Sequence, residues 1–269
     1  MLSNTSRLFT YLTGSLYAVL GFLLFFLAEQ LAAVFAWKVT PFMTMTIGGW
    51  CIGNAWLAWI TARRWQWSLV YSALLYLWSF GLGEILVLFN FRDKLVLAHP
   101  IAWLYFITLL VNALTAVVGF VDWLCIRPAL ALSNREFSTR LYIATIVYIL
   151  FVAFLGLYGS TAKAGSPGTN GGIFPEVMSP FTLRSFGMFY LTLALAVIPF
   201  LWNRNVNAIL HHAIASYGLI IFITAAAFVY IRLFDFAEKP GGLLYFMAYL
   251  AVGISLIFVF RNLGTGASA

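Results

Sequence analysis

Glu84 stands out chemically because it is a carboxylate inside an otherwise apolar segment, Trp67–Phe89. Ionisable side chains inside a membrane-spanning helix are costly and often bind protons or cations. Glu84 lies about five residues from the end of the segment, roughly 8 Å below the edge of a bilayer. Thr46 and Tyr105 should lie at similar depths on neighbouring segments, where they could hydrogen-bond to it. Glu84 is therefore a proton-coupling or cation site, or a structural carboxylate that is hydrogen-bonded or paired with an arginine.

Two asparagines, Asn54 and Asn112, are expected deeper in the membrane, roughly 18–20 Å from the same ends of their segments. At one depth on neighbouring helices, they could hydrogen-bond to each other. Buried amides of this kind usually hold helices together, although they can also line a polar path. We expect the structural role. The positions that correspond to them in the second half, near Leu193 and Val252, are apolar.

The second half of the chain places its charges near the outer ends of its helices. Arg184 lies about one turn into a segment, and Arg232 and Asp235 stand three residues apart on one helix face. Together they suggest an outer charge network. Such a network could bind an anion, but we expect it to anchor the helix ends.

The sequence contains few other residues or motifs that could bind a metal or carry out catalysis. His99 and the pair His211 and His212 should lie at opposite membrane surfaces, so a shared metal or haem site is not expected. The sequence has no HExxH motif, no Gly-Lys-Thr phosphate loop and no paired aspartate motif. We therefore expect no catalytic residue, no metal site and no cofactor. Cys51 and Cys125 have no CxxC spacing and are expected to be buried free thiols.

The composition explains where these residues must act. Of the 269 residues, 63% are hydrophobic and 9% are charged, far from the balance of soluble domains. A soluble fold of this size could not bury such an excess, which excludes soluble enzymes and disordered chains. The net charge of +7 fits loops beside anionic lipids. No long basic cluster is present, so nucleic acid is not an expected partner, and the lipid bilayer is.

Hydropathy predicts an all-α fold, a polytopic transmembrane helical bundle. A helix needs about 20 mostly apolar residues to cross the bilayer. Eight segments satisfy this requirement: Leu8–Ala28, Pro41–Thr61, Trp67–Phe89, Pro100–Val121, Leu141–Gly159, Phe181–Trp202, Ile209–Val229 and Leu243–Phe260. The segment Glu29–Lys38 is apolar with charged ends and is expected to lie in the membrane interface.

Loop charges predict the orientation. With eight spans, both termini lie on one side of the membrane. The Arg63-Arg64 pair and the basic linker 126–140 fall on that side. Because basic loops favour the cytoplasm, we expect a multi-pass protein of the cell inner (plasma) membrane with both termini cytoplasmic.

Repeated sequence patterns predict an internal repeat. Val39-Thr40-Pro41-Phe42 resembles Met178-Ser179-Pro180-Phe181, and a glycine follows each phenylalanine at the same distance, Gly48 and Gly187. Two later pairs recur in the same order: Leu88-Phe89-Asn90-Phe91 with Leu233-Phe234-Asp235-Phe236, and Leu104-Tyr105-Phe106 with Leu244-Tyr245-Phe246. We expect two tandem, parallel four-helix halves, 1–125 and 141–269, joined by the linker 126–140.

The repeated motif is explained by helix capping and packing. Thr40 or Ser179 caps the helix, and proline occupies the first helical position, where its missing N–H is harmless. The later glycine allows a neighbouring helix to approach closely. A structural role is therefore expected for the motif.

The doubled helix start also resembles one found in uncharacterised bacterial polytopic membrane proteins. Their helices open with a Thr-Pro-x-Thr-x-Arg-x-x-Gly pattern. The second half fits it with Ser179-Pro180-Phe181-Thr182-Leu183-Arg184-Ser185-Phe186-Gly187, preceded by Phe174-Pro175. The first half departs from it, with Met45 in place of the arginine. The resemblance implies a membrane protein and no particular activity.

Scarce interior charge favours a non-catalytic function. We expect a membrane scaffold or accessory subunit that packs against other membrane-protein subunits, or that holds a hydrophobic ligand such as a lipid, quinone or pigment. The alternative is a transporter of a small molecule or ion, with Glu84 as its coupling carboxylate. A lipid-modifying enzyme ranks third.

Overall fold

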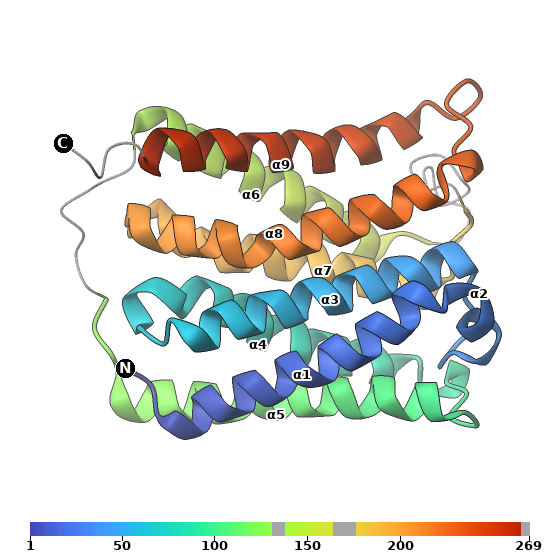
Figure 1. Ribbon diagram of the computed structural model, residues 1–269, viewed down its shortest axis with the longest axis horizontal. Coiled ribbons are helices and arrows are strands. Elements are labelled where there is room, and N and C mark those ends of the chain that lie inside the picture. The colour runs from blue at the N-terminus through green and yellow to red at the C-terminus, as the bar shows by residue number, and fades with distance from the viewer. Residues whose placement is uncertain (131–137, 164–175, 265–269) are drawn as a thin grey trace.

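The computed structural model describes residues 1–130, 138–163 and 176–264, and every regular element in these ranges is a helix. The long helices lie side by side (Figure 1). They are α1 (Asn4–Phe26), α3 (Pro41–Arg63), α4 (Trp67–Asn90), α5 (Pro100–Ile126), α6 (Thr139–Thr161), α7 (Pro180–Val197), α8 (Val206–Val229) and α9 (Gly241–Gly264). Short helices connect or extend them: α2 (Ala28–Leu31), η1 (Ala32–Val34), η2 (Arg92–Lys94), η3 (Ile198–Leu201) and η4 (Ile231–Leu233). The expected all-α fold is thereby confirmed.

Six helices in the described ranges are long and apolar enough to cross a membrane. They are α1, α4, α5, α6, α7 continued through η3, and α8. The chain is therefore a membrane protein. α3 and α9 occupy the other two predicted spans but are not among the six. α3 has 23 residues, which is sufficient length, but Thr44, Thr46 and Asn54 make it less apolar.

α3 tolerates these polar residues because it lies in the interior. It packs against α1, α4 and α8, and Thr44, Thr46 and Asn54 are all fully buried. In Figure 1, α3, α4, α7 and α8 form the centre of the bundle, with α1 and α5 on one side and α6 and α9 on the other. We call the end at which α1 and α6 begin the inner end, after the predicted orientation, and the opposite end the outer end.

Local capping signals set the helix starts. Thr40 accepts a hydrogen bond from the backbone N–H of Met43, and Pro41 opens α3. Ser179 accepts one from the N–H of Thr182, and Pro180 opens α7. The expected starts at Pro41, Trp67 and Pro100 are confirmed. The linker 126–140 cannot be followed completely, because 131–137 lie outside the described residues.

The two motif glycines lie where helix backbones meet. A Cβ atom added at Gly48 would lie 2.5 Å from the backbone nitrogen of Phe25 in α1. At Gly187 the added atom would lie 2.5 Å from the backbone nitrogen of Ser160 in α6. Only glycine permits these crossings, as expected for close helix packing.

Two local expectations need correction. The segment Glu29–Lys38 does not simply lie at the surface, because Phe35, Ala36 and Trp37 are buried in the bundle. Aromatic contacts with Tyr105 and Phe181 hold this part of the segment inside. Both cysteines are free, but only Cys51 is buried, whereas Cys125 is exposed on α5.

Candidate functional site

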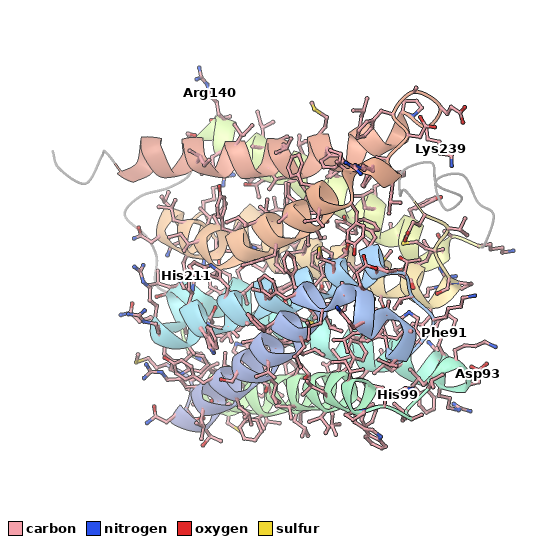
Figure 2. All side chains as sticks on the ribbon, turned by 45° about the vertical axis from the view of Figure 1, so that its right-hand side comes forward. Phe91, Asp93, His99, Arg140, His211 and Lys239 are labelled. Atoms are coloured by element: carbon pink, nitrogen blue, oxygen red, sulfur yellow. The ribbon has the colours of Figure 1, made fainter. Side chains whose placement is uncertain are left out.

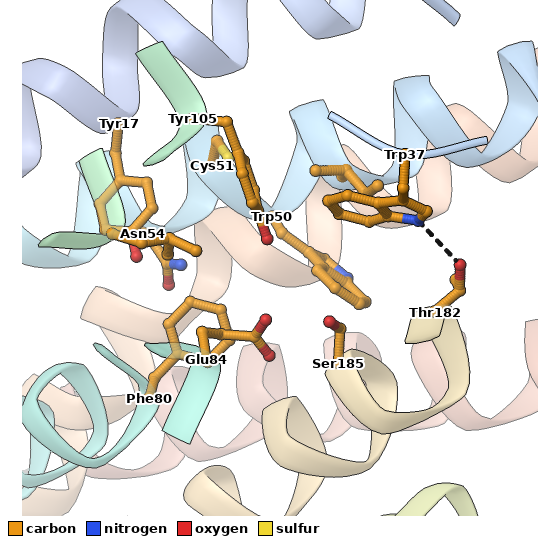
Figure 3. A pocket seen from close by; sticks show the side chains of 12 residues that line it. Tyr17, Trp37, Trp50, Cys51, Asn54, Phe80, Glu84, Tyr105, Thr182 and Ser185 are labelled. Carbon is orange, nitrogen blue, oxygen red and sulfur yellow. Dashed lines mark hydrogen bonds between the residues drawn. The ribbon is translucent and has the colours of Figure 1, made fainter. Parts of the chain in front are cut away.

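A small cavity of about 20 Å³ lies between the central helices and is large enough for about one water molecule. Its lining comes from α1, α3, α4, α5, α7 and the segment before α3. The lining residues are Tyr17, Trp37, Ile47, Trp50, Cys51, Asn54, Phe80, Glu84, Tyr105, Leu109, Thr182 and Ser185. Figure 3 shows Glu84 pointing into this space.

Glu84 has no charged partner in this cavity. The residue is 1% exposed, and neither carboxylate oxygen accepts a hydrogen bond of ordinary geometry, although Ser185 lies close enough to interact. The described residues contain one salt bridge, Lys94 with Asp93 at the surface, so no cation pairs with Glu84 there. Burying an ionised, unpaired carboxylate is strongly unfavourable. A proton or a small cation on Glu84 would remove this cost.

Three hydrogen-bond donors around the cavity, on Ser185, Trp50 and Asn54, also have no hydrogen bond of ordinary geometry. Ser185 of α7 points its hydroxyl toward the Glu84 carboxylate (Figure 3), and its oxygen has no hydrogen bond of ordinary geometry. The indole N–H of Trp50, on α3, has none either. Buried polar groups are almost always satisfied by protein or by ordered water. One water in the cavity could bridge such groups, so the arrangement suits a hydrated, protonatable carboxyl.

The structure separates the two asparagines instead of joining them. Asn54 accepts a 2.8 Å hydrogen bond from the hydroxyl of Tyr76, and its amide nitrogen is unpartnered and buried. Asn112 donates a 2.8 Å hydrogen bond to the hydroxyl of Tyr17. Each therefore connects to a tyrosine on another helix. Asn54 borders the Glu84 cavity, whereas Asn112 does not line it.

Of the two expected partners of Glu84, Tyr105 lies beside it and Thr46 makes no hydrogen bond with it. Tyr105 lines the cavity together with Glu84. Thr46 instead donates its hydroxyl to the backbone carbonyl of Phe42, one turn earlier in its own helix. Such back-bonding satisfies a buried threonine locally, so Thr46 is not a partner of Glu84.

Arg184, Arg232 and Asp235 do not form ion pairs with one another. Arg184 donates hydrogen bonds of 2.7 and 2.9 Å to the carbonyls of Gly159 and Ala162, where α6 ends. Asp235 accepts from the N–H groups of Ala237 and Glu238, and Arg232 is exposed. Helix ends leave carbonyls unpaired, and Arg184 satisfies two of them.

His99 is far from the neighbouring pair His211 and His212, as expected (Figure 2). His99 and His211 lie at opposite ends of the bundle (Figure 2). No group of three or more metal-binding side chains occurs among the described residues. His212 contacts Ser72 through its Nδ1 at 2.9 Å.

Sequence reasoning missed Ser185, Trp50 and Trp37. A serine and two tryptophans in an aromatic-rich apolar sequence attract no attention singly. Ser185 could have been identified by a spacing. Oxygen-bearing side chains recur every third residue before α7 and in its first turns, at Glu176, Ser179, Thr182 and Ser185.

Protein-family models, curated proteins and solved structures were compared with this chain, and none of them matches it.

Proposed function

We propose that the chain crosses the membrane eight times, as two tandem parallel four-helix halves with both termini cytoplasmic. The same contacts occurring twice support this. α1 crosses α3 at Gly48 and α6 crosses α7 at Gly187, and α4 packs on α5 as α8 packs on α9. Across the halves, α3 packs on α8 and α7 on α4. A pseudo-twofold axis along the membrane normal would relate these pairs.

On this architecture we propose a membrane carrier that couples a proton, bound at Glu84, to the movement of a small solute or ion. The observation that carries the proposal is the buried Glu84 carboxyl, which has no charged partner and no hydrogen bond of ordinary geometry, in a water-sized cavity. The cavity lies between the halves, with Glu84 from the first and Ser185 from the second. Carriers commonly bind their coupling ion at such an interface.

Hydrogen bonds between the halves at both ends support an occluded carrier state. At the outer end, Trp37 donates to Thr182 and Tyr230 donates to Glu29. At the inner end, Ser72 donates to the carbonyl of Ala196 and contacts His212. Opening either end would expose the cavity to one side at a time.

Proteoliposomes carrying a pH-sensitive dye inside would test this function. Gradients of Na⁺, K⁺, amino acids, organic acids and sugars would be imposed one at a time. At least one gradient should drive a pH change with the wild-type protein, and Glu84→Gln should abolish it. Glu238→Gln removes an exposed carboxylate and should leave the flux unchanged. Equal fluxes with wild type and Glu84→Gln would refute the proposal.

A scaffold or accessory subunit is the second candidate, favoured by one surface of α6. Large apolar side chains form a stripe along it, and each is more than half exposed: Ile143, Val147, Leu150, Phe154 and Leu157. The stripe suits contact with lipid, with a partner helix, or with a hydrophobic ligand such as a quinone or pigment. A ligand of that size would not fit the central cavity. The mass of the protein purified in mild detergent tests this role, and a monomer without bound ligand would contradict it.

A further inference from the structure

Oxygen-bearing side chains lie along the approach to α7 and its first turns, from the outer end of the bundle toward Glu84. Glu176 and Ser179 precede the helix, whereas Thr182 and Ser185 stand three residues apart on one face of it. We call these four residues the oxygen ladder.

On the outer side the ladder makes two separate sets of contacts, one at Glu176 and one at Ser179, which is itself partly exposed. Glu176, partly buried, accepts a hydrogen bond from the hydroxyl of Thr40. The hydroxyl oxygens of Ser179 and Thr182 lie 3.0 Å apart. Thr182 and Ser185 both line the cavity that holds Glu84. One water in the cavity would link Thr182 and Ser185 to Glu84, because a water can accept one proton and donate another.

Trp37 covers the ladder at the outer wall of the cavity. Its ring is 4% exposed and stacks on Phe181 at 4.2 Å. Its indole nitrogen donates a 3.2 Å hydrogen bond to the Thr182 hydroxyl (Figure 3). Trp37 lies in the nonhelical stretch between η1 and α3, so it can move without unwinding a helix.

The inner side of the cavity is closed by large rings. Tyr76 is fully buried, stacks on Phe80 at 5.7 Å and meets Phe189 edge-on. Its hydroxyl is engaged with Asn54. Access from this side would require helix-borne rings to separate, whereas on the outer side the ring that lies over Thr182 is Trp37, which belongs to a nonhelical stretch.

The other titratable groups that face the cavity are neutral at ordinary pH. They are Tyr17 of α1, Cys51 of α3 and Tyr105 of α5. No charged side chain other than Glu84 lines the cavity. A proton that arrives along the ladder would therefore be retained by the carboxylate of Glu84, which becomes a neutral carboxyl.

We propose that Glu84 exchanges protons with the aqueous phase at the outer end through the oxygen ladder, and that Trp37 is the cover of this route. The inference rests on the proposed function, which makes Glu84 the proton-binding group. Each hydroxyl or water accepts one proton and passes its own proton on, so the groups of the route that change their net protonation are the carboxyls Glu176 and Glu84.

The native thiol of Cys51 provides a test of access, because it lines the same cavity. Cys125→Ser leaves Cys51 as the sole thiol in the chain. In vesicles of uniform orientation, a small charged methanethiosulfonate is added to one side at a time. Trp37→Ala should speed the modification of Cys51 from the outer end about tenfold or more, the factor expected when an interaction of roughly 1.4 kcal/mol is lost. Trp103→Ala changes a tryptophan that is 48% exposed and should have no effect.

Trp37→Phe keeps one aromatic ring for stacking and removes the pyrrole part of the indole with its N–H, so it serves if Trp37→Ala fails to fold. It should speed modification from the outer end by a few-fold, as for one hydrogen bond. Modification of Cys51 from the inner end only, or equal rates in the Trp37 and Trp103 variants, would overturn the proposed route.

Proton uptake by Glu84 after a pH jump tests the ladder itself. Uptake is defined as the part lost in Glu84→Gln. Thr182→Val and Ser185→Ala should slow it about tenfold, the effect of roughly 1.4 kcal/mol on a barrier. Thr192→Val removes a hydroxyl on α7 that bonds to its own backbone, and it should leave the rate unchanged. Unchanged rates in Thr182→Val and Ser185→Ala would overturn the ladder alone, whereas no Glu84-dependent uptake would overturn the proposed function.

Discussion

Glu84 of α4 and Ser185 of α7 face each other across the central cavity, and neither side chain makes a hydrogen bond of ordinary geometry. Native proteins rarely leave buried polar groups in this condition, because each unsatisfied group destabilises the fold. A carboxyl kept at such a cost is characteristic of a functional residue, since activity commonly trades against stability.

This trade leads to a prediction about stability. Glu84→Met removes the buried carboxyl and keeps the length of the side chain, so it should stabilise the protein by about 1–3 kcal/mol. Thermal unfolding in detergent measures the change. Glu84→Gln keeps the polar group and should stay near the wild-type midpoint. A clear loss of stability in Glu84→Met would show that the carboxyl makes a structural contact.

The glycine crossings should be equally important in the two halves. Gly48→Ala and Gly187→Ala each bring a Cβ atom to 2.5 Å from a backbone nitrogen. Overpacking of this kind costs about 1–3 kcal/mol, and the backbone cannot move aside easily. Unfolding midpoints should fall similarly in both variants. At Gly253 of α9 the nearest atom would be 3.5 Å away, so Gly253→Ala should be tolerated. A drop confined to one half would argue against equivalent crossings.

Arg184 should matter as a helix cap. Arg184→Ala leaves the carbonyls of Gly159 and Ala162 without their donor and should cost about 1–2 kcal/mol. Arg184→Lys should restore part of this stability, because an ammonium group can still donate. Arg232→Ala, at an exposed arginine, should change the unfolding midpoint little. Equal effects at both arginines would contradict the capping role.

Glu176 should give the protein a pH-dependent stability. Burial raises the pKa of its carboxyl above the ordinary value, and the hydrogen bond from Thr40 opposes this in part. Its contribution is full below the pKa of the unfolded chain, about 4.3, and is lost as the pH rises through the higher folded pKa. Wild type should therefore lose stability over this range relative to Glu176→Gln, which does not titrate.

Unfolding midpoints measured at a series of pH values for both proteins would show this divergence. Glu238→Gln controls for the removal of a carboxylate at the exposed surface. A constant difference between wild type and Glu176→Gln at all pH values would contradict the shift of the Glu176 pKa.

The sequence was most informative where the physics is local. Thr40-Pro41 and Ser179-Pro180 carry their own capping chemistry, so the helix starts were predictable from a few residues. The position of Glu84 within an apolar segment indicated a carboxyl away from water, and its side chain is buried. The direction in which each side chain points around its helix depends on tertiary packing, and this is why Asn54 and Asn112 were expected to meet when each meets a tyrosine.

Long-range packing also explains the residues that were overlooked. Trp37 belongs to a segment that looks interfacial, and its contacts with Tyr105, Phe181 and Thr182 draw it into the bundle. Ser185 becomes notable only when α7 is placed against α4. The spacing of Glu176, Ser179, Thr182 and Ser185 was visible in the sequence, but only the fold shows that it leads toward a carboxylate.

Infrared spectroscopy of the protein in lipid membranes tests the central claim most directly, because it observes the proton on Glu84. The difference between the spectra of wild type and Glu84→Gln should contain the C=O band of one protonated carboxyl. That band should convert reversibly to carboxylate bands as the pH is raised and return as it is lowered. If the difference spectrum contains no such band at any pH, or a band that never responds to pH, Glu84 is not an exchanging proton site.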